Sequence, residues 1–144
     1  MQFSQEHNNS AYVIKSFQPG IIRIIQPVTA QLLLEADNEP DKVNELRHFN
    51  LSKSAIISIN TLIDNWPPHS VDELQNEHIE AILSLNPEIV IIGTGERTVW
   101  PHPEIMQALI ERGIGYEIMT THAACRTYNV LMHEDRKVAA ALML

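Results

Sequence analysis

Short, almost continuous apolar runs recur along the second half of the chain, and their length is typical of strands buried on both faces of a sheet. These runs cover residues 55–59, 89–92, 116–119 and 138–144. Segments with helical spacing of apolar residues separate them, so the predicted order from residue 54 onward is β-α-β-α-β-α-β. Helical connections imply parallel neighbouring strands joined by right-handed crossovers. The loop before the last strand is short, which leaves the direction of that strand open.

The first predicted helix of this region spans residues 77–85 and is bounded by a cap and a proline. Ser70 has capping-box spacing to Glu73, and Asn76 offers a second cap. Pro87 ends the helix, because the residue before a proline avoids helical geometry. The side chains expected to be buried are Ile79, Ile82 and Leu83.

Two further helices are predicted from their end signals. One starts at Pro103, a residue suited to the first helical position, and stops at Gly113. Its expected buried residues are Ile105, Met106, Leu109 and Ile110. The other has its cap at Thr120 or Thr121 and runs to about His133.

The beginning of the chain is predicted to add a β hairpin. Residues 11–17 and 21–25 are rich in strand-forming side chains, and Pro19 and Gly20 between them are turn residues. Residues 1–10 are polar and aperiodic, and we expect them to form a flexible tail.

Residues 26–50 do not give a single interpretation. Helical character is present over 30–36 and again over 41–48, with a break between them. The whole segment is a candidate insertion. An apolar surface near residues 26–36 would either cover the core or form a homodimer contact, and the pattern does not separate these alternatives.

The elements together predict one domain over residues 11–144, because 144 residues with 44% apolar side chains suffice for a single core. The predicted fold class is a three-layer α/β domain. Its central sheet is mostly parallel (mixed) and flanked by helices, and the N-terminal β hairpin is added to it.

Charge narrows the range of partners. The chain has 10 Lys and Arg residues against 18 Asp and Glu residues, a net charge of -8, which disfavours nucleic acid and anionic membranes. No apolar run approaches the roughly 20 residues of a spanning helix, and the first residues lack the pattern of a signal peptide. A single cysteine excludes an internal disulfide. These features predict a cytoplasmic protein without a membrane span.

The first candidate site follows the strand at 89–92. Gly93, Thr94 and Gly95 come at its carboxyl end, where glycines expose backbone N–H groups to a ligand. Thr98 stands where a dinucleotide-binding motif has its third glycine, so that interpretation is weak. The alternative is a sharp turn with no ligand.

A second group of polar residues follows the strand at 116–119. The start of the next helix carries Arg126, Thr127 and Asn129. Helix N-termini attract anions, and arginine adds a donor for carboxylate or phosphate. Arg97 is expected to converge on the same sheet edge. In the alternative interpretation, Arg126 only pairs with Glu96 or Glu104 and ties down the loop.

Catalytic and metal-binding groups are not indicated. Cys125 and His122 have helical spacing, but no third orienting group accompanies them. The seven histidines form no tight metal-ligand pattern, and no cofactor motif is complete. Trp66 is expected to pack over the sheet, whereas Trp100 is a candidate recognition anchor.

Five segments resemble, in this order, a family of small α/β domains of largely unassigned function. That family includes mitochondrial complex I assembly factor 3 and the adipogenesis-associated domain protein. The segments cover residues 64–67, 87–95, 113–121, 124–131 and 136–142. The resemblance extends over about residues 52–144. Two departures are Thr120, where the family often has an acid, and Asp135, where it usually has a turn glycine.

The resemblance implies a three-layer fold with a mixed sheet, no established enzymatic activity and no known cofactor. For the mitochondrial relatives it implies protein binding during complex I assembly. We therefore expect a non-enzymatic protein-binding or assembly-factor-like module that contacts a protein partner of unknown identity around Arg97, Trp100 and Arg126. The alternative is an anion-binding small-molecule site, with or without enzymatic activity, between Gly93-Thr94-Gly95 and the helix start near Thr121.

Overall fold

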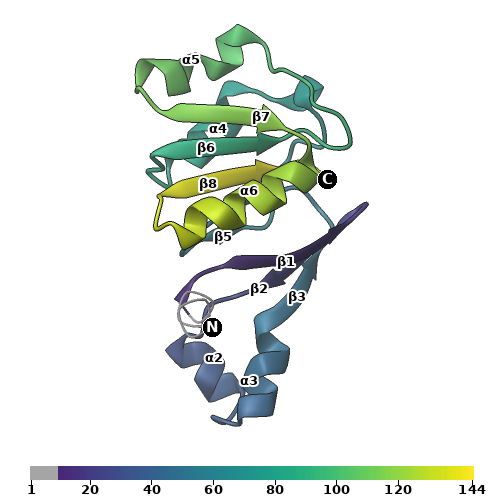
Figure 1. Ribbon diagram of the computed structural model, residues 1–144, viewed down its shortest axis with the longest axis vertical. Helices are drawn as coiled ribbons and strands as arrows, with labels where there is room; N and C mark the ends of the chain where they lie inside the picture. Colours follow the sequence, from purple (N-terminus) through teal and green to yellow (C-terminus); the bar gives the residue numbers. More distant parts are fainter. Residues whose placement is uncertain (1–9) are drawn as a thin grey trace.

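The computed structural model describes residues 10–144, which form two β-sheets with covering helices (Figure 1). The smaller sheet contains β1 (Val13–Gln18), β2 (Ile21–Ile25) and β3 (His48–Leu51), in that order. The larger sheet has the order β5-β4-β8-β6-β7 and contains β4 (Ala55–Ser58), β5 (Leu62–Ile63), β6 (Ile89–Gly93), β7 (Gly115–Met119) and β8 (Val138–Leu142). The helices are α2 (Ala30–Glu35), α3 (Pro40–Arg47), α4 (Asn76–Leu83), α5 (Pro103–Glu111) and α6 (Thr121–His133), with a 3-10 turn η1 (Val71–Glu73).

The predicted fold class is confirmed. The larger sheet is mixed and flanked by helices, and the predicted N-terminal hairpin is present as β1 and β2, extended by β3. Apart from Ser10, the tail predicted for residues 1–10 lies outside the described residues.

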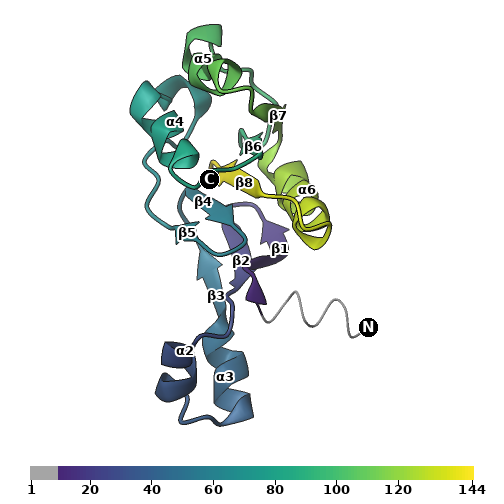
Figure 2. The ribbon, with the colours of Figure 1, turned by 90° about the vertical axis from the view of Figure 1, so that its left-hand side faces the viewer.

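The larger sheet is the middle layer, and its two faces differ because side chains alternate along each strand. On one face, Ile57 and Ile91 belong to a core shared with α6 and the smaller sheet. On the other face, Ile56 and Ile92 pack with residues of α4 and α5. Figure 2 shows α4 and α5 on one side of this sheet and α6 on the other.

Strand β8 occupies the centre of the larger sheet, between β4 and β6. All five of its residues are buried, which suits a strand covered on both faces and paired on both edges. The strand direction left open by the sequence is parallel to β6 and antiparallel to β4. The prediction of parallel neighbours is wrong for β4. Its neighbours in the sheet are β8 and β5, and it runs antiparallel to both. With two residues, β5 is too short to leave an apolar pattern.

Helix α6 joins the two sheets. The Tyr128 side chain is fully buried, and its hydroxyl donates to the Tyr12 carbonyl oxygen at 2.7 Å. The Asn129 side chain accepts from the Ile14 N–H at 3.0 Å and donates to the Ile14 carbonyl oxygen at 2.6 Å. Asn129 therefore pairs with β1 as a neighbouring strand would, and it satisfies both backbone groups of Ile14 on that edge.

Residues 26–47 form a helical hairpin, here called the arm, which leaves the smaller sheet between β2 and β3. Both helices anticipated in this ambiguous segment are present, as α2 and α3. Thr29 caps α2 by accepting the Leu32 N–H, and Asp37 and Asn38 turn the chain with positive φ angles of 51° and 57°. The arm lies at the end of the molecule opposite α5 (Figure 1).

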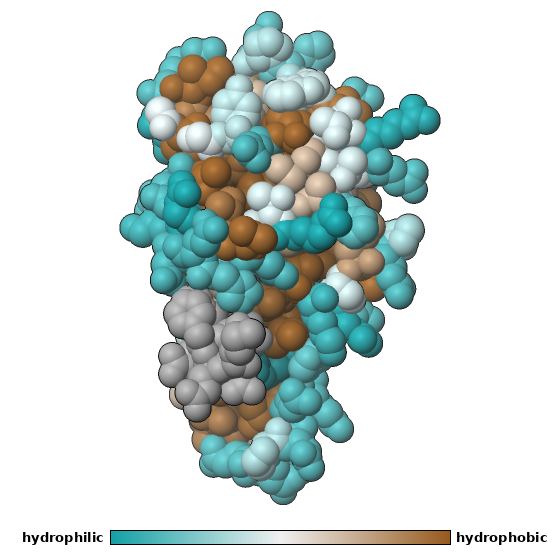
Figure 3. Space-filling view, in the orientation of Figure 1, coloured by the Kyte–Doolittle hydropathy of each residue, from teal (hydrophilic) through white to brown (hydrophobic). Residues whose placement is uncertain are grey.

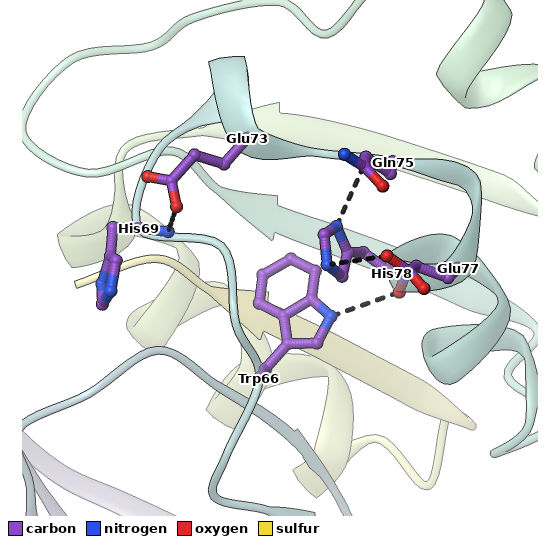
Figure 4. Close-up of polar contacts among 6 residues, drawn as sticks. All are labelled: Trp66, His69, Glu73, Gln75, Glu77 and His78. Atoms are coloured by element: carbon purple, nitrogen blue, oxygen red, sulfur yellow. Dashed lines mark hydrogen bonds and ion pairs between the residues drawn. The ribbon is translucent and has the colours of Figure 1, made fainter.

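The start of α4 differs from both predicted caps. Ser70 precedes η1 and makes no side-chain cap hydrogen bond, and Asn76 is the first helical residue instead of the cap. The cap position belongs to Gln75, whose N–H donates to Nδ1 of His78 at 2.9 Å (Figure 4). The His78 ring has the role that a glutamate or glutamine usually has in a capping box. The usual sequence pattern therefore does not identify the cap at Gln75.

Trp66 packs as predicted. Its side chain is 3% exposed, and its indole N–H donates to the His78 carbonyl oxygen at 3.2 Å. The indole and imidazole rings meet edge to face with centroids 6.3 Å apart (Figure 4). Trp66 therefore fastens the connection after β5 to the first turn of α4.

The remaining helix predictions hold except for two side chains of α5. This helix starts at Pro103 and buries Met106 and Leu109, but Ile105 is only half-buried, and Ile110 is 51% exposed and was wrongly placed in the core. The structure explains this because α5 covers the outermost strand, β7, and only a narrow side of the helix meets the sheet. At the turn after α6, Asp135 has the positive φ of 61° that the family's glycine would adopt.

Gly93, at the end of β6, lets that strand approach α6 closely. A Cβ atom at this position would lie 2.9 Å from the Thr121 Cα and 3.0 Å from the Ala124 Cβ. The first of these neighbours is backbone, which cannot rotate away. Glycine is therefore required here by packing between strand and helix.

Replacing Asn129 by alanine should lower the free energy of unfolding by about 2 kcal/mol, because the N–H and the carbonyl of Ile14 both lose their partner. Urea unfolding followed by circular dichroism measures this change. Val130→Ala is the matched control, since Val130 is 57% exposed on the same helix and should change stability by less than about 0.5 kcal/mol. Equal stability of the two variants would contradict the role given to Asn129.

Gly93→Ala should destabilise the protein by about 1–3 kcal/mol, through overpacking against α6. Gly115→Ala serves as the control, because a Cβ at Gly115 meets no atom within 4 Å. Thermal unfolding of both variants is the measurement. A Gly93→Ala variant as stable as Gly115→Ala would show that β6 and α6 do not touch as closely as described.

Candidate functional site

A pocket of about 450 Å³ lies where β6, β7 and β8 end, at the carboxyl edge of the parallel part of the larger sheet. This is the edge at which open α/β sheets usually bind ligands. The pocket, called here the edge pocket, is bordered by four separate segments: the β1–β2 turn, the residues after β6, the start of α6 and the residues after β8. Its lining residues are Phe17, Pro19, Gly20, Gly95, Glu96, Thr120, Thr121, His122, Met143 and Leu144.

Thr121 holds three of these segments together. Its hydroxyl accepts from the Gly95 N–H at 2.8 Å and donates to the Met143 carbonyl oxygen at 2.8 Å. Its own N–H donates to the Gly95 carbonyl oxygen at 2.9 Å. Thr121 is 1% exposed, so these bonds are shielded from water. The sequence suggested Thr121 as a possible helix cap and as the border of the alternative anion site; the cap proves to be Thr120, which accepts the Ala123 N–H.

Several of the backbone donors at this edge are already used inside the protein. The Thr94 N–H donates to the Met119 carbonyl oxygen, and the N–H groups of Gly95, Thr121 and Ala123 have the partners described above. A turn or helix start binds an anion through free N–H groups. The geometry therefore gives no support to the anion-binding alternative.

Arg97 and Trp100 lie in the loop of residues 94–102, here called the Trp100 loop, and neither lines the edge pocket. Trp100 is 69% exposed and Val99 is 43% exposed. The Thr94 hydroxyl fixes the loop from within, since it donates to the Arg97 carbonyl oxygen and accepts from the Val99 N–H at 3.0 Å. The loop thus presents apolar side chains on a backbone that is tied to β6.

Arg126, Thr127 and Asn129 all lie on α6, but they do not converge on the pocket. Arg126 is exposed, and within residues 10–144 it makes no ion pair with Glu96, Glu104 or another acid. The Thr127 hydroxyl donates to the Ala123 carbonyl oxygen at 2.9 Å, and Asn129 bonds β1. Of the predicted site residues, Gly95 lines the pocket, and Gly93 and Thr94 precede it in the chain without being part of the lining.

Cys125 and His122 do not form a nucleophile and its base. Cys125 is 3% exposed, and burial raises the pKa of its thiol to about 12, so it stays protonated near neutral pH. His122 is exposed and stacks on Phe17, with ring centroids 4.9 Å apart and planes inclined by 15°. Within the described part of the chain, no three His, Cys, Asp or Glu side chains are grouped as metal ligands would be.

Several lining residues of the edge pocket were not anticipated from the sequence. Phe17, Pro19 and Gly20 were interpreted only as strand and turn, and Glu96 only as a partner for Arg126. Their contribution depends on the hairpin folding back against the carboxyl edge of the larger sheet, which no local pattern encodes. The Pro-Gly turn was visible in the sequence, but its tertiary position was not.

Comparison with known proteins places this architecture among relatives. The chain is 32% identical over 93 residues to the "13 kDa major membrane protein" of Francisella tularensis subsp. holarctica (strain LVS), covering 65% of this chain and 72% of that protein. It is 40% identical over 80 residues to mouse "NADH dehydrogenase [ubiquinone] 1 alpha subcomplex assembly factor 3", covering 54% of this chain and 43% of that protein. The chain thus spans less than half of this longer relative. Among the described residues, none of the helices is long and apolar enough to span a membrane.

A solved structure from Xanthomonas campestris extends the likeness to nearly the whole chain. The two structures superpose with a TM-score of 0.70 and 34% sequence identity. The matched region covers 99% of this chain and 92% of the Xanthomonas chain. The model of the family described as "Protein of unknown function (DUF498/DUF598)" matches residues 42–143. The match includes the whole larger sheet and α6, and on this basis the chain belongs to the DUF498/DUF598 family.

Proposed function

We propose that this protein is a non-enzymatic protein-binding module that captures its partner with the Trp100 loop. The observation that carries the proposal is the 69% exposure of Trp100 on a loop tied to the sheet by Thr94. Exposing a large aromatic side chain to water is unfavourable. Burial by a partner would recover that free energy, and tryptophan is the residue type most enriched at the centres of protein interfaces.

The surroundings of Trp100 support the same interpretation. Val99 beside it adds exposed apolar surface, and the Arg97 side chain has no ion-pair partner among the described residues. Arginine shares the interface enrichment of tryptophan. Because the Thr94 hydroxyl holds the loop backbone in place, less conformational entropy is lost on binding.

Arg126 is proposed as a second contact, made from the exposed side of α6. Gly93, Thr94 and Gly95 frame the surface, whereas Thr127 and Asn129 would act through the position of the helix. The proposal involves no catalytic residue, no metal and no cofactor.

The similarity to a complex I assembly factor is consistent with protein binding, since that relative is named for assembling a protein complex. The partner of this chain is not specified by that name. A cytoplasmic location stays a prediction.

A homodimer formed through the arm also stays a prediction. On the face shown in Figure 3, apolar surface occurs in separate areas, one of them over α2 at the lower end. Leu34 on this helix is 74% exposed.

Trp100→Ala should leave folding intact and reduce partner capture at least about tenfold, as expected for a central interface residue. The measurement is native mass spectrometry of the protein isolated gently from its own host, which names a bound protein by its mass. Arg126→Ala should show a smaller loss. Leu34→Ala is the matched control, since Leu34 is similarly exposed but lies in the arm. Undiminished capture by Trp100→Ala would remove the Trp100 loop from the interface.

A further inference from the structure

We infer that the edge pocket binds a small organic cation, an amine carried on an apolar or aromatic body. The pocket adjoins the protein-binding surface proposed above, since Gly95 and Glu96 of the Trp100 loop line it, but none of Arg97, Trp100 and Arg126 does. Its volume of about 450 Å³ lies within the range of roughly 300–1,000 Å³ typical of small-molecule sites.

The walls of the edge pocket suit an apolar body. The lining includes Phe17 and Pro19 from the hairpin and Met143 and Leu144, which follow β8. The Phe17 ring is held in position by stacking on His122 at 4.9 Å. An aromatic ring fixed in this way offers a flat contact for the body of a ligand and attracts a cation over its face.

The charge of the pocket favours a cation. Glu96 is the only acidic side chain of the lining, and the lining includes no lysine or arginine. Across residues 10–144, no ion pair or hydrogen bond engages the Glu96 carboxylate. Glu96 is exposed, so its carboxylate is accessible to a ligand, and an amine would bind it with a charge-assisted hydrogen bond.

The start of α6 also borders the pocket and carries a partial positive charge, which would favour an anion. Two observations reduce this effect. The N–H groups of Thr121 and Ala123 are bonded within the protein, and so is the N–H of Gly95 on the facing turn. The helix end contributes about half an elementary charge at most, whereas the Glu96 carboxylate contributes a full one.

The test is a titration followed by amide chemical shifts in two-dimensional NMR, with three probes of similar shape. Phenethylamine is the cation, 2-phenylethanol the neutral analogue and 3-phenylpropionate the anion. Saturable shifts are expected at Gly95, Thr121 and His122, with the amine bound about fivefold more tightly than the alcohol and the carboxylate bound most weakly.

Two variants assign the effect. Glu96→Gln should abolish the preference for the amine over the alcohol, while Glu104→Gln, which makes the same charge change on α5 outside the lining, should preserve it. Phe17→Ala should weaken the binding of the amine and of the alcohol by the same factor. The inference is overturned if no probe gives saturable shifts at these amides, if the carboxylate binds best, or if Glu96→Gln keeps the full amine preference.

Discussion

The packing of α6 between the two sheets is the interaction on which the rest of this structure depends. Its buried side contributes Ala124, Cys125, Tyr128 and Met132 to the core that the larger sheet shares with the smaller one. Its polar side chains add hydrogen bonds between the helix and the smaller sheet, because Tyr128 and Asn129 bond backbone groups at the start of β1. Without this helix, one face of the larger sheet would lose its cover, and the smaller sheet would lose the side-chain bonds of Tyr128 and Asn129 to the start of β1.

The same helix positions the carboxyl edge of the larger sheet. Gly93 admits the first turn of α6 at van der Waals distance, and Thr121 then bonds both the turn after β6 and the chain after β8. Thr94 extends this network into the Trp100 loop. The edge pocket and the Trp100 loop are therefore positioned by one framework, and Gly95 and Glu96 belong to both.

Local patterns predicted the elements of this fold well but not their arrangement. The strands at β4, β6, β7 and β8, the hairpin, and the cap at Thr120 all follow from short-range spacing and turn chemistry. The central position of β8 and the direction of β4 depend on pairing between segments far apart in the chain. The exposure of Ile110 likewise depends on how much of α5 meets β7.

The candidate site was predicted in part, for the same reason. Position after a strand correctly brought Gly95 and the start of α6 together. The position after a strand did not show that several backbone donors there are bonded within the protein, or that the Asn129 side chain is hydrogen-bonded to β1. The bonds of Thr94, Gly95, Thr121 and Ala123 leave fewer free donors for an anion at this edge, whereas the Glu96 carboxylate makes no bond within residues 10–144.

The central claim is that α6 makes the two sheets and the carboxyl edge one cooperative unit. Native-state hydrogen exchange, measured residue by residue, tests it most directly. The account predicts that the amides of Ile14 and Gly95, which bond side chains of α6, exchange with the same opening free energy as the Ile91 amide in the centre of the larger sheet. Exchange of Ile14 through a separate opening of much lower free energy would show that the smaller sheet unfolds on its own, and would contradict the account.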